Sequence, residues 1–259
     1  MASTTSTIPI RARSYVIIPA RIGSSRLPRK LLLADTGKPL IQHTYEAASQ
    51  AQRPSGFCVA VDDPELADAV HAFGGTAVMT DRFAASGTDR VAEVARTLDD
   101  VDIVVNVQGD EPDIAPTAID QVIELLEATP DAAMATLATP IRCRHKLEDP
   151  ACVKVVFDCQ GRALYFSRSA IPHVRDWRDE VLLAEPPLFF QHIGLYAYRR
   201  DFLLSLAEMD RSDHEQLENL EQLRVLSAGE TILVGVTHTP AIGVDTPSDY
   251  AAFVQRMAG

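Results

Sequence analysis

A cluster of positive charge follows the first apolar run of the chain. Segment 20–30 (ARIGSSRLPRK) holds four cations and no acidic residue, although the whole chain carries 36 acidic residues against 24 Lys and Arg. Arg and Lys neutralise phosphate charge, and hydroxyls and free backbone amides donate hydrogen bonds to phosphate oxygens. We therefore expect a polyphosphate to bind here, and the candidate contacts are Arg21, Ser24, Ser25, Arg26 and Lys30.

The position of this loop favours a ligand over its alternative, a solvated basic turn. The loop directly follows segment 15–19 (YVIIP), which has the composition of a buried strand. Ligands of open α/β sheets bind beyond the carboxyl ends of the strands. The chain contains neither G-x-x-x-x-G-K-[ST] nor G-x-G-x-x-G, so the loop is not a Walker A or a dinucleotide-binding motif.

Two aspartates have the chemistry and the expected location of magnesium ligands. Asp110 follows the apolar run 102–107, and Asp245 lies between a strand candidate and the last helical pattern. Magnesium prefers oxygen ligands and is usually held by one or two carboxylates together with substrate phosphates. The alternative is that either aspartate only shapes a turn or a helix start, particularly Asp245 beside Thr246.

The elements that must position these residues alternate between strand and helix patterns. Apolar spacing predicts helices over 40–51, 64–73, 89–98 and 116–129, separated by strands at 15–19, 57–61, 77–79 and 102–107. This alternation predicts an α/β fold, with a mostly parallel, Rossmann-like sheet covered by helices on both faces.

The second half of the chain has a different pattern. Strands 153–157 and 163–166 flank a predicted hairpin turn, 172–187 is rich in turn residues, and strands follow at 193–198 and 232–237. A leucine stripe predicts one helix that ends near Gly229, and a capping box predicts a last helix that starts at Thr246. We expect a flexible tail at 1–14 and a single domain at 15–259, with a β-rich portion at about 140–210.

Composition excludes several classes of function. The chain is 46% hydrophobic and 23% charged with a net charge of −12, so we expect neither nucleic acid nor an anionic membrane as a partner. No stretch approaches the ~20 apolar residues that span a bilayer. The four cysteines form no C-x-x-C pair, which argues against a zinc ribbon or redox motif and favours reduced thiols in the cytoplasm.

Six motifs in order resemble those of the 3-deoxy-manno-octulosonate (Kdo) cytidylyltransferases, from about Tyr15 to the C-terminus. They lie at 18–30 (IPARIGSSRLPRK), 86–90 (SGTDR), 106–112 (NVQGDEP), 163–168 (ALYFSR), 220–224 (LEQLR) and 243–247 (GVDTP). The resemblance implies a nucleotide-diphospho-sugar transferase type of fold and the reaction of CTP with Kdo to give CMP-Kdo and pyrophosphate. Two positions depart from the family pattern: Arg29 where glycine is common, and Asp89 where glutamate is frequent.

The resemblance also implies roles for individual residues. Arg21 and Lys30 would neutralise the triphosphate with help from Arg26, and Asp110 and Asp245 would hold Mg²⁺. Further nucleotide contacts would come from Ser86, Thr88, Arg90 and Gln108, although Ser86 or Thr88 as a plain helix cap is an equal alternative. The sugar contacts would be Gln108, Arg168, His192, Tyr196, Glu221 and Gln222, with the Arg168 guanidinium on the sugar carboxylate.

Other functions remain as alternatives. The sugar could be an acylneuraminate or another acid sugar in place of Kdo. The use of UTP or GTP is less favoured, because enzymes with that choice have a first loop richer in glycine. A non-catalytic nucleotide-binding protein would be expected to have lost the basic loop residues or the aspartates, and here Arg21, Lys30, Asp110 and Asp245 are all present. The family further implies a homodimer.

Overall fold

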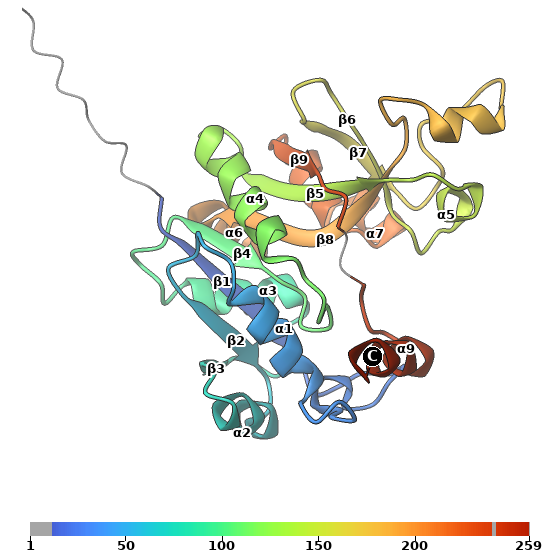
Figure 1. Ribbon diagram of the computed structural model, residues 1–259. Helices are drawn as coiled ribbons and strands as arrows, with labels where there is room; N and C mark the ends of the chain where they lie inside the picture. The colour runs from blue at the N-terminus through green and yellow to red at the C-terminus, as the bar shows by residue number, and fades with distance from the viewer. Residues whose placement is uncertain (1–11, 240–241, 259) are drawn as a thin grey trace, which may run out of the picture.

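The apolar runs of the first half form parallel strands of one sheet (Figure 1). The computed structural model describes residues 12–239 and 242–258. In space the strands follow the order β3-β2-β1-β4-β8-β5-β9. Their bounds are β1 Ser14–Ala20, β2 Phe57–Val61, β3 Ala77–Met79, β4 Ile103–Asn106, β5 Met134–Pro140, β8 Phe190–Arg199 and β9 Ile232–Val236.

The predicted α/β class is confirmed. Pairings β1–β2, β1–β4, β2–β3 and β5–β9 are parallel, whereas β8 runs antiparallel to both β4 and β5. Strand order reverses at β1, because the chain first builds β2 and β3 on one side and then places β4 on the other. Such a switch point leaves a crevice at the carboxyl ends of the strands, and here these are the ends of β1 and β4.

Helices cover both faces of the sheet. Alternate residues of β1 point to opposite cores: Val16 and Ile18 pack with α1, α2, α4 and α9, and Ile17 packs with α3, α6 and α8. The helices are α1 Leu40–Ala48, α2 Pro64–Ala72, α3 Gly87–Ala95, α4 Pro116–Ala128, α5 Arg144–Glu148, α6 Arg200–Glu208, α7 Asp213–Glu218, α8 Gln222–Ser227 and α9 Pro247–Ala258. No helix in the described ranges is long and apolar enough to cross a membrane.

The β-rich portion of the chain is attached to the main sheet. Strands β6 (Lys154–Phe157) and β7 (Ala163–Ser167) form the predicted hairpin, whose turn ends at Gly161 with a φ of 77°. The hairpin joins β8 through the pair Lys154 and Gln191. The described residues also contain two short 3-10 helices, Lys30–Leu32 at the end of the basic loop and Asp179–Leu183 in the predicted turn-rich segment.

Two predicted boundaries need correction. The leucine stripe does not form one helix, because Asn219 adopts a left-handed conformation (φ 51°) between α7 and α8 and leaves Leu217 84% exposed. Ser14 is the first residue of β1 and does not belong to a tail, whereas residues 1–11 of the predicted tail lie outside the described residues. The predicted capping box of the last helix is confirmed, since the Asp249 carboxylate accepts from Thr246 N at 2.8 Å.

Candidate active site

A buried carboxylate at the end of β2 fixes the path of the basic loop. Asp62 Oδ1 accepts a hydrogen bond from Ile22 N at 2.8 Å, and Asp62 Oδ2 lies 3.6 Å from Arg90 Nη2. The side chains of Asp62 and Arg90 are only 8% and 5% exposed, so this ion pair is shielded from water. It ties the loop after β1 to the first turn of α3.

Asp110 and Asp245 meet at the side chain of Lys30. Lys30 Nζ donates to Asp110 Oδ2 at 2.5 Å and to Asp245 Oδ1 at 2.9 Å. The two segments are also joined through their backbones, because Val244 N donates to Asp110 O at 2.9 Å. Arg26 Nη2 adds a further contact to Asp245 Oδ1 at 3.0 Å. The structure therefore brings together the basic loop and both aspartates predicted from the sequence.

A glycine places Asp110 against the end of β1. A Cβ atom at Gly109 would lie 2.9 Å from Pro19 O, which is closer than real Cβ contacts allow. The Gly109 carbonyl accepts from Thr44 Oγ1 at 2.9 Å, so α1 holds this turn from the other side. Close backbone approach is a common reason for glycine, and here it sets the position of the following carboxylate.

The basic loop and the aspartates line a cavity of about 540 Å³, which we call the loop cavity. The predicted residues that line it are Arg21, Ser24, Ser25, Arg26, Lys30, Ser86, Arg90, Gln108, Asp110, Glu221 and Asp245. Ser86 is also the N-cap of α3, since its Oγ accepts from Asp89 N at 3.1 Å. The capping interpretation thus holds for Ser86 and does not remove it from the cavity.

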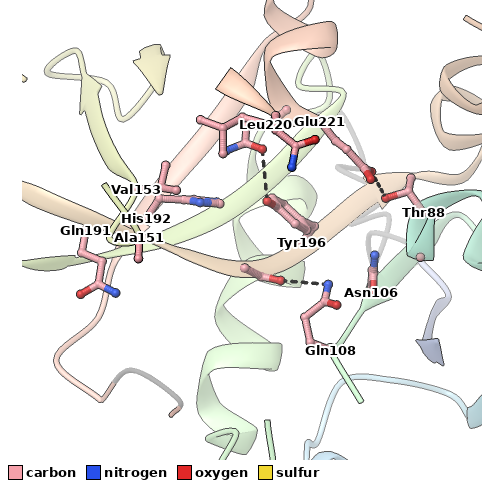
Figure 2. Close-up of a pocket in the computed structure, with 14 residues that line it drawn as sticks. Thr88, Asn106, Gln108, Ala151, Val153, Gln191, His192, Tyr196, Leu220 and Glu221 are labelled. Carbon is pink, nitrogen blue, oxygen red and sulfur yellow. Dashed lines mark hydrogen bonds between the residues drawn. The ribbon is translucent and has the colours of Figure 1, made fainter. Parts of the chain in front are cut away.

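A second cavity of about 350 Å³, which we call the strand cavity, lies over β8 (Figure 2). The predicted residues that line it are Thr88, Gln108, His192, Tyr196, Glu221 and Gln222. Thr88 Oγ1 donates to Glu221 Oε2 at 2.6 Å, and Tyr196 Oη donates to Gln222 Oε1 at 3.4 Å. Gly87, Gln108, Asn219 and Glu221 line both cavities, so the two cavities are adjacent at these residues.

Burial sets the protonation of the groups in the strand cavity. Removal from water lowers the pKa of His192 to about 3, so this imidazole is neutral and a weak base at neutral pH. Its Nε2 lies 3.1 Å from Thr136 Oγ1. Burial, with the charges of Glu221 and Glu111, also raises the pKa of Tyr196, which stays protonated and remains a hydrogen-bond donor. The cavity thus presents neutral polar groups with one acid, Glu221.

Arg168 is the predicted site residue that lines neither cavity. Its guanidinium donates to backbone carbonyls, from Nε to Glu218 O at 2.7 Å and from Nη1 to Pro150 O at 3.1 Å. The buried Lys154 holds the same region, because its Nζ donates to Arg168 O at 2.5 Å and to Cys152 O at 2.6 Å. These bonds support the wall that carries Ala151 and Asn219. Contact of Arg168 with a sugar carboxylate stays a prediction.

Several lining residues were not predicted from the sequence, namely Asn106, Gln191, Arg211 and Asn219. Asn106 had a recognisable signal, because a polar residue ends the apolar run of β4. Its buried Oδ1 has no hydrogen-bond partner among the residues that the structure describes. The other three lie in the second half of the chain. Only the tertiary fold brings their segments close to the first half, so there was no local signal for them in the sequence.

The donor set of the loop cavity fits Mg²⁺. Within the described residues, no group of three or more His, Cys, Asp or Glu side chains could hold a metal ion, so the candidate ligands are two carboxylates. Both carboxylates converge on one ammonium group, which shows that a cation can lie between them. Mg²⁺ is commonly bound in this way, with substrate phosphates and water as the other ligands. Beside this pair, burial and then the charge of Asp110 raise the pKa of Glu111 to about 8.

Comparison with known proteins shows the class to which this protein belongs. Residues 15–232 match the family model described as Cytidylyltransferase, and the class of protein is thereby defined. A 3-deoxy-manno-octulosonate cytidylyltransferase from Rhodopirellula baltica is 51% identical over 95% of this chain and 98% of its own length, and one from Geotalea uraniireducens is 49% identical over 93% and 97%. The chain belongs to the family of 3-deoxy-manno-octulosonate cytidylyltransferases.

Solved structures support the same fold. The structure of CMP:2-keto-3-deoxy-manno-octonic acid synthetase complexed with CTP is 42% identical, with a TM-score of 0.88 over 95% of this chain and 99% of that one. A cytidylyltransferase from Leptospira borgpetersenii is 15% identical with a TM-score of 0.63, over 95% of this chain and 87% of that one, and shares the fold.

Proposed function

We propose that this protein transfers CMP from CTP to the anomeric hydroxyl of Kdo, releases pyrophosphate, and so activates the sugar for lipopolysaccharide biosynthesis. One observation carries the proposal: two adjacent cavities share Gln108 and Glu221 in their linings, and Asp110, Asp245 and Lys30 line the first of them. The names of the relatives supply the two substrates, and one solved relative is a complex with CTP.

In this mechanism the nucleotide lies in the loop cavity and the sugar in the strand cavity. The anomeric oxygen attacks the α-phosphorus, the bond from that phosphorus to the bridging oxygen breaks, and its electron pair leaves with pyrophosphate. Arg21, Arg26 and Lys30 neutralise the negative charge of the triphosphate and of the leaving group. His192 is a poor candidate for a base because its pKa is about 3, so the hydroxyl proton passes to water. Catalysis rests on positioning and on charge.

Mg²⁺ is the cofactor that we propose for the loop cavity. Asp110 and Asp245 would hold it together with phosphate oxygens. The bound ion would draw negative charge from the phosphates and lower the pKa of the attacking hydroxyl. Lys30, which here bridges the two carboxylates, would then be available to the phosphates. We also propose a homodimer and a cytoplasmic location, which the family resemblance implies.

A second sugar is a specific alternative. An 8-amino-3,8-dideoxy-manno-octulosonate cytidylyltransferase from Shewanella loihica is 46% identical over 94% of this chain and 98% of its own length. A Kdo enzyme from Geobacter sulfurreducens has the same identity of 46%. Overall identity therefore does not separate the two sugars, and both belong in the assay.

The proposal is tested by pyrophosphate release with CTP and Mg²⁺. Kdo, 8-amino-Kdo and N-acetylneuraminate are compared, with a control without sugar. We expect release with Kdo above the control and none with N-acetylneuraminate. Release with 8-amino-Kdo alone would show that this sugar, and not Kdo, is the substrate, and the proposed mechanism would still apply. If none of the three sugars causes pyrophosphate release while CTP still binds, the proposed enzymatic activity is refuted. A non-catalytic nucleotide-binding protein would then be favoured.

A further inference from the structure

Arg211 lines the loop cavity together with the basic loop, although the two are far apart in the sequence. It lies between α6 and α7, in the half of the chain that contributes β8 and α8, and Arg21 and Lys30 come from the segment after β1. The backbone of Arg211 is fixed, because its carbonyl accepts from Gln216 Nε2 at 3.1 Å. Its side chain is 54% exposed. A held backbone with an exposed guanidinium is suited to contact a ligand.

Within the described residues, the ion pair found for Arg211 is a long one. Arg211 Nε lies 3.9 Å from Glu215 Oε1, beyond hydrogen-bond distance. Glu215 is already paired with Arg224, whose Nε and Nη2 donate to the two carboxylate oxygens at 2.7 and 2.5 Å. This two-bond pair is nearly buried, with side chains 5% and 12% exposed. Glu215 therefore has little remaining capacity to hold Arg211.

Most other cations of the loop cavity are already bound to carboxylates. Lys30 contacts Asp110 and Asp245, Arg26 contacts Asp245, and Arg90 lies beside Asp62. Within the described part of the chain, no side-chain hydrogen bond or ion pair is found for Arg21, and the guanidinium of Arg211 makes only the 3.9 Å contact with Glu215. They face the same space from different halves of the fold.

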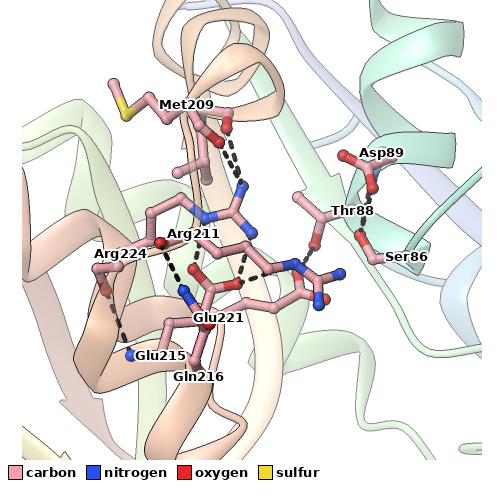
Figure 3. Close-up of polar contacts among 11 residues, drawn as sticks. Ser86, Thr88, Asp89, Met209, Arg211, Glu215, Gln216, Glu221 and Arg224 are labelled. Carbon is pink, nitrogen blue, oxygen red and sulfur yellow. Dashed lines mark hydrogen bonds and ion pairs between the residues drawn. The ribbon is translucent and has the colours of Figure 1, made fainter.

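The location of Arg211 is close to the junction of the two cavities. Figure 3 shows its side chain extending past Glu215 toward Glu221 and Thr88. Glu221 and Asn219, which line the loop cavity together with Arg211, also line the strand cavity. The strand cavity itself has no Lys or Arg among its lining residues in the described chain. Arg211 thus lines the loop cavity together with two residues that also line the strand cavity.

We propose that Arg211 is a substrate-binding residue that holds an oxyanion in the loop cavity, from the half of the chain that does not contain the basic loop. The oxyanion is a phosphate oxygen of the nucleotide or the carboxylate of the acid sugar, which share the same chemistry toward a guanidinium. The substrates would then be held from both halves of the fold. This inference rests on the proposed function for its choice of substrates.

The test compares Arg211→Met with Arg211→Lys and with the control Arg175→Met. Arg175 is exposed and lines neither cavity, so the control removes the same charge elsewhere. CTP affinity is measured by calorimetry without sugar, and KM and kcat for Kdo are measured at saturating CTP. The loss of one hydrogen bond between charged groups predicts about a tenfold weaker constant in Arg211→Met and partial recovery in Arg211→Lys.

The two measurements identify the source of the oxyanion. A weaker CTP affinity assigns Arg211 to the nucleotide, and a raised KM for Kdo with unchanged CTP affinity assigns it to the sugar carboxylate. If both constants of Arg211→Met equal those of Arg175→Met, the proposal is wrong. Failure of the proposed function is distinguishable, because the wild-type protein would then show no turnover with Kdo, while the CTP affinities would still test Arg211.

Discussion

The ion pair of Glu215 and Arg224 is a strong determinant of stability next to the active site. Glu215 is 4% exposed, and Arg224 also donates to Leu206 O at 3.1 Å and to Met209 O at 3.4 Å. The pair therefore links α6, α7 and α8, and α8 begins with Gln222 of the strand cavity. The hydrogen bonds with Glu215 are the first cause of a raised pKa of Arg224, so this guanidinium is charged at neutral pH.

Arg224→Met leaves a buried carboxylate without its counterion. Removal of one partner of a buried ion pair costs about 3–5 kcal/mol, whereas replacement of both partners by apolar residues is often nearly neutral. We expect the free energy of unfolding to fall by about 3–5 kcal/mol in Arg224→Met and in Glu215→Met. For a chain of this length, that corresponds to a Tm lower by about 6–20 °C. The double variant should lose less than the sum of the two single variants.

Urea unfolding of the four proteins provides the measurement. The double-mutant cycle isolates the coupling energy of the two side chains, which we expect to be at least about 2 kcal/mol. Arg96→Met is a suitable control, because Arg96 and Glu208 form an exposed pair at 3.8 Å that should contribute under about 1 kcal/mol. A loss below 1 kcal/mol in Arg224→Met, or simple additivity in the cycle, would refute the reasoning.

Three further predictions concern the site and its supports. Gly109→Ala should lower the free energy of unfolding by about 1–3 kcal/mol and reduce turnover, because the added Cβ would lie 2.9 Å from a backbone oxygen. Unchanged turnover and stability would contradict this prediction. Asp62→Ala should weaken CTP affinity about tenfold in calorimetry, because Ile22 N loses its hydrogen-bond acceptor and the buried Arg90 loses its carboxylate partner. An unchanged affinity would show that the Asp62 carboxylate is not needed to hold the basic loop. His192 has a pKa near 3 when folded and about 6.5 when unfolded, so protonation of the unfolded chain should remove about 2 kcal/mol of stability between pH 7 and pH 5. In His192→Gln the free energy of unfolding should lack this part of the pH dependence. If urea unfolding gives the same loss of free energy between pH 7 and pH 5 for the variant and the wild-type protein, the prediction is wrong.

Local patterns were sufficient for most elements of the first half. Strands β2 and β3 have the predicted bounds. The ends of helices α1 to α4 lie within a few residues of the ends predicted for them. Strand β5 gave no clear signal, because Met134–Pro140 is buried along almost its whole length and shows no alternation of apolar and polar residues. The leucine stripe predicted one helix, whereas the structure has a left-handed turn at Asn219 that ends α7 before α8 begins.

The candidate site followed from the sequence where its residues directly follow strands. The convergence of Asp110 and Asp245 was predicted from strand ends, and the structure adds the Lys30 bridge. Arg29 stands where the family often has glycine, and its φ of 54° gives the physical reason, since glycine adopts this conformation without strain. The contacts of Arg168 with backbone carbonyls and the position of Arg211 depend on tertiary packing that periodicity does not encode.

The central claim is that the carboxylates bridged by Lys30 form the catalytic centre, and CMP-Kdo formation by Asp110→Asn tests it most directly. Asp113→Asn is the matched control, because Asp113 pairs with Arg256 at the surface and lines neither cavity. With the fold unchanged by circular dichroism, we expect turnover to fall about 10²–10³-fold in Asp110→Asn and to stay within about twofold in the control. Turnover in Asp110→Asn close to that of the wild-type protein would contradict the account.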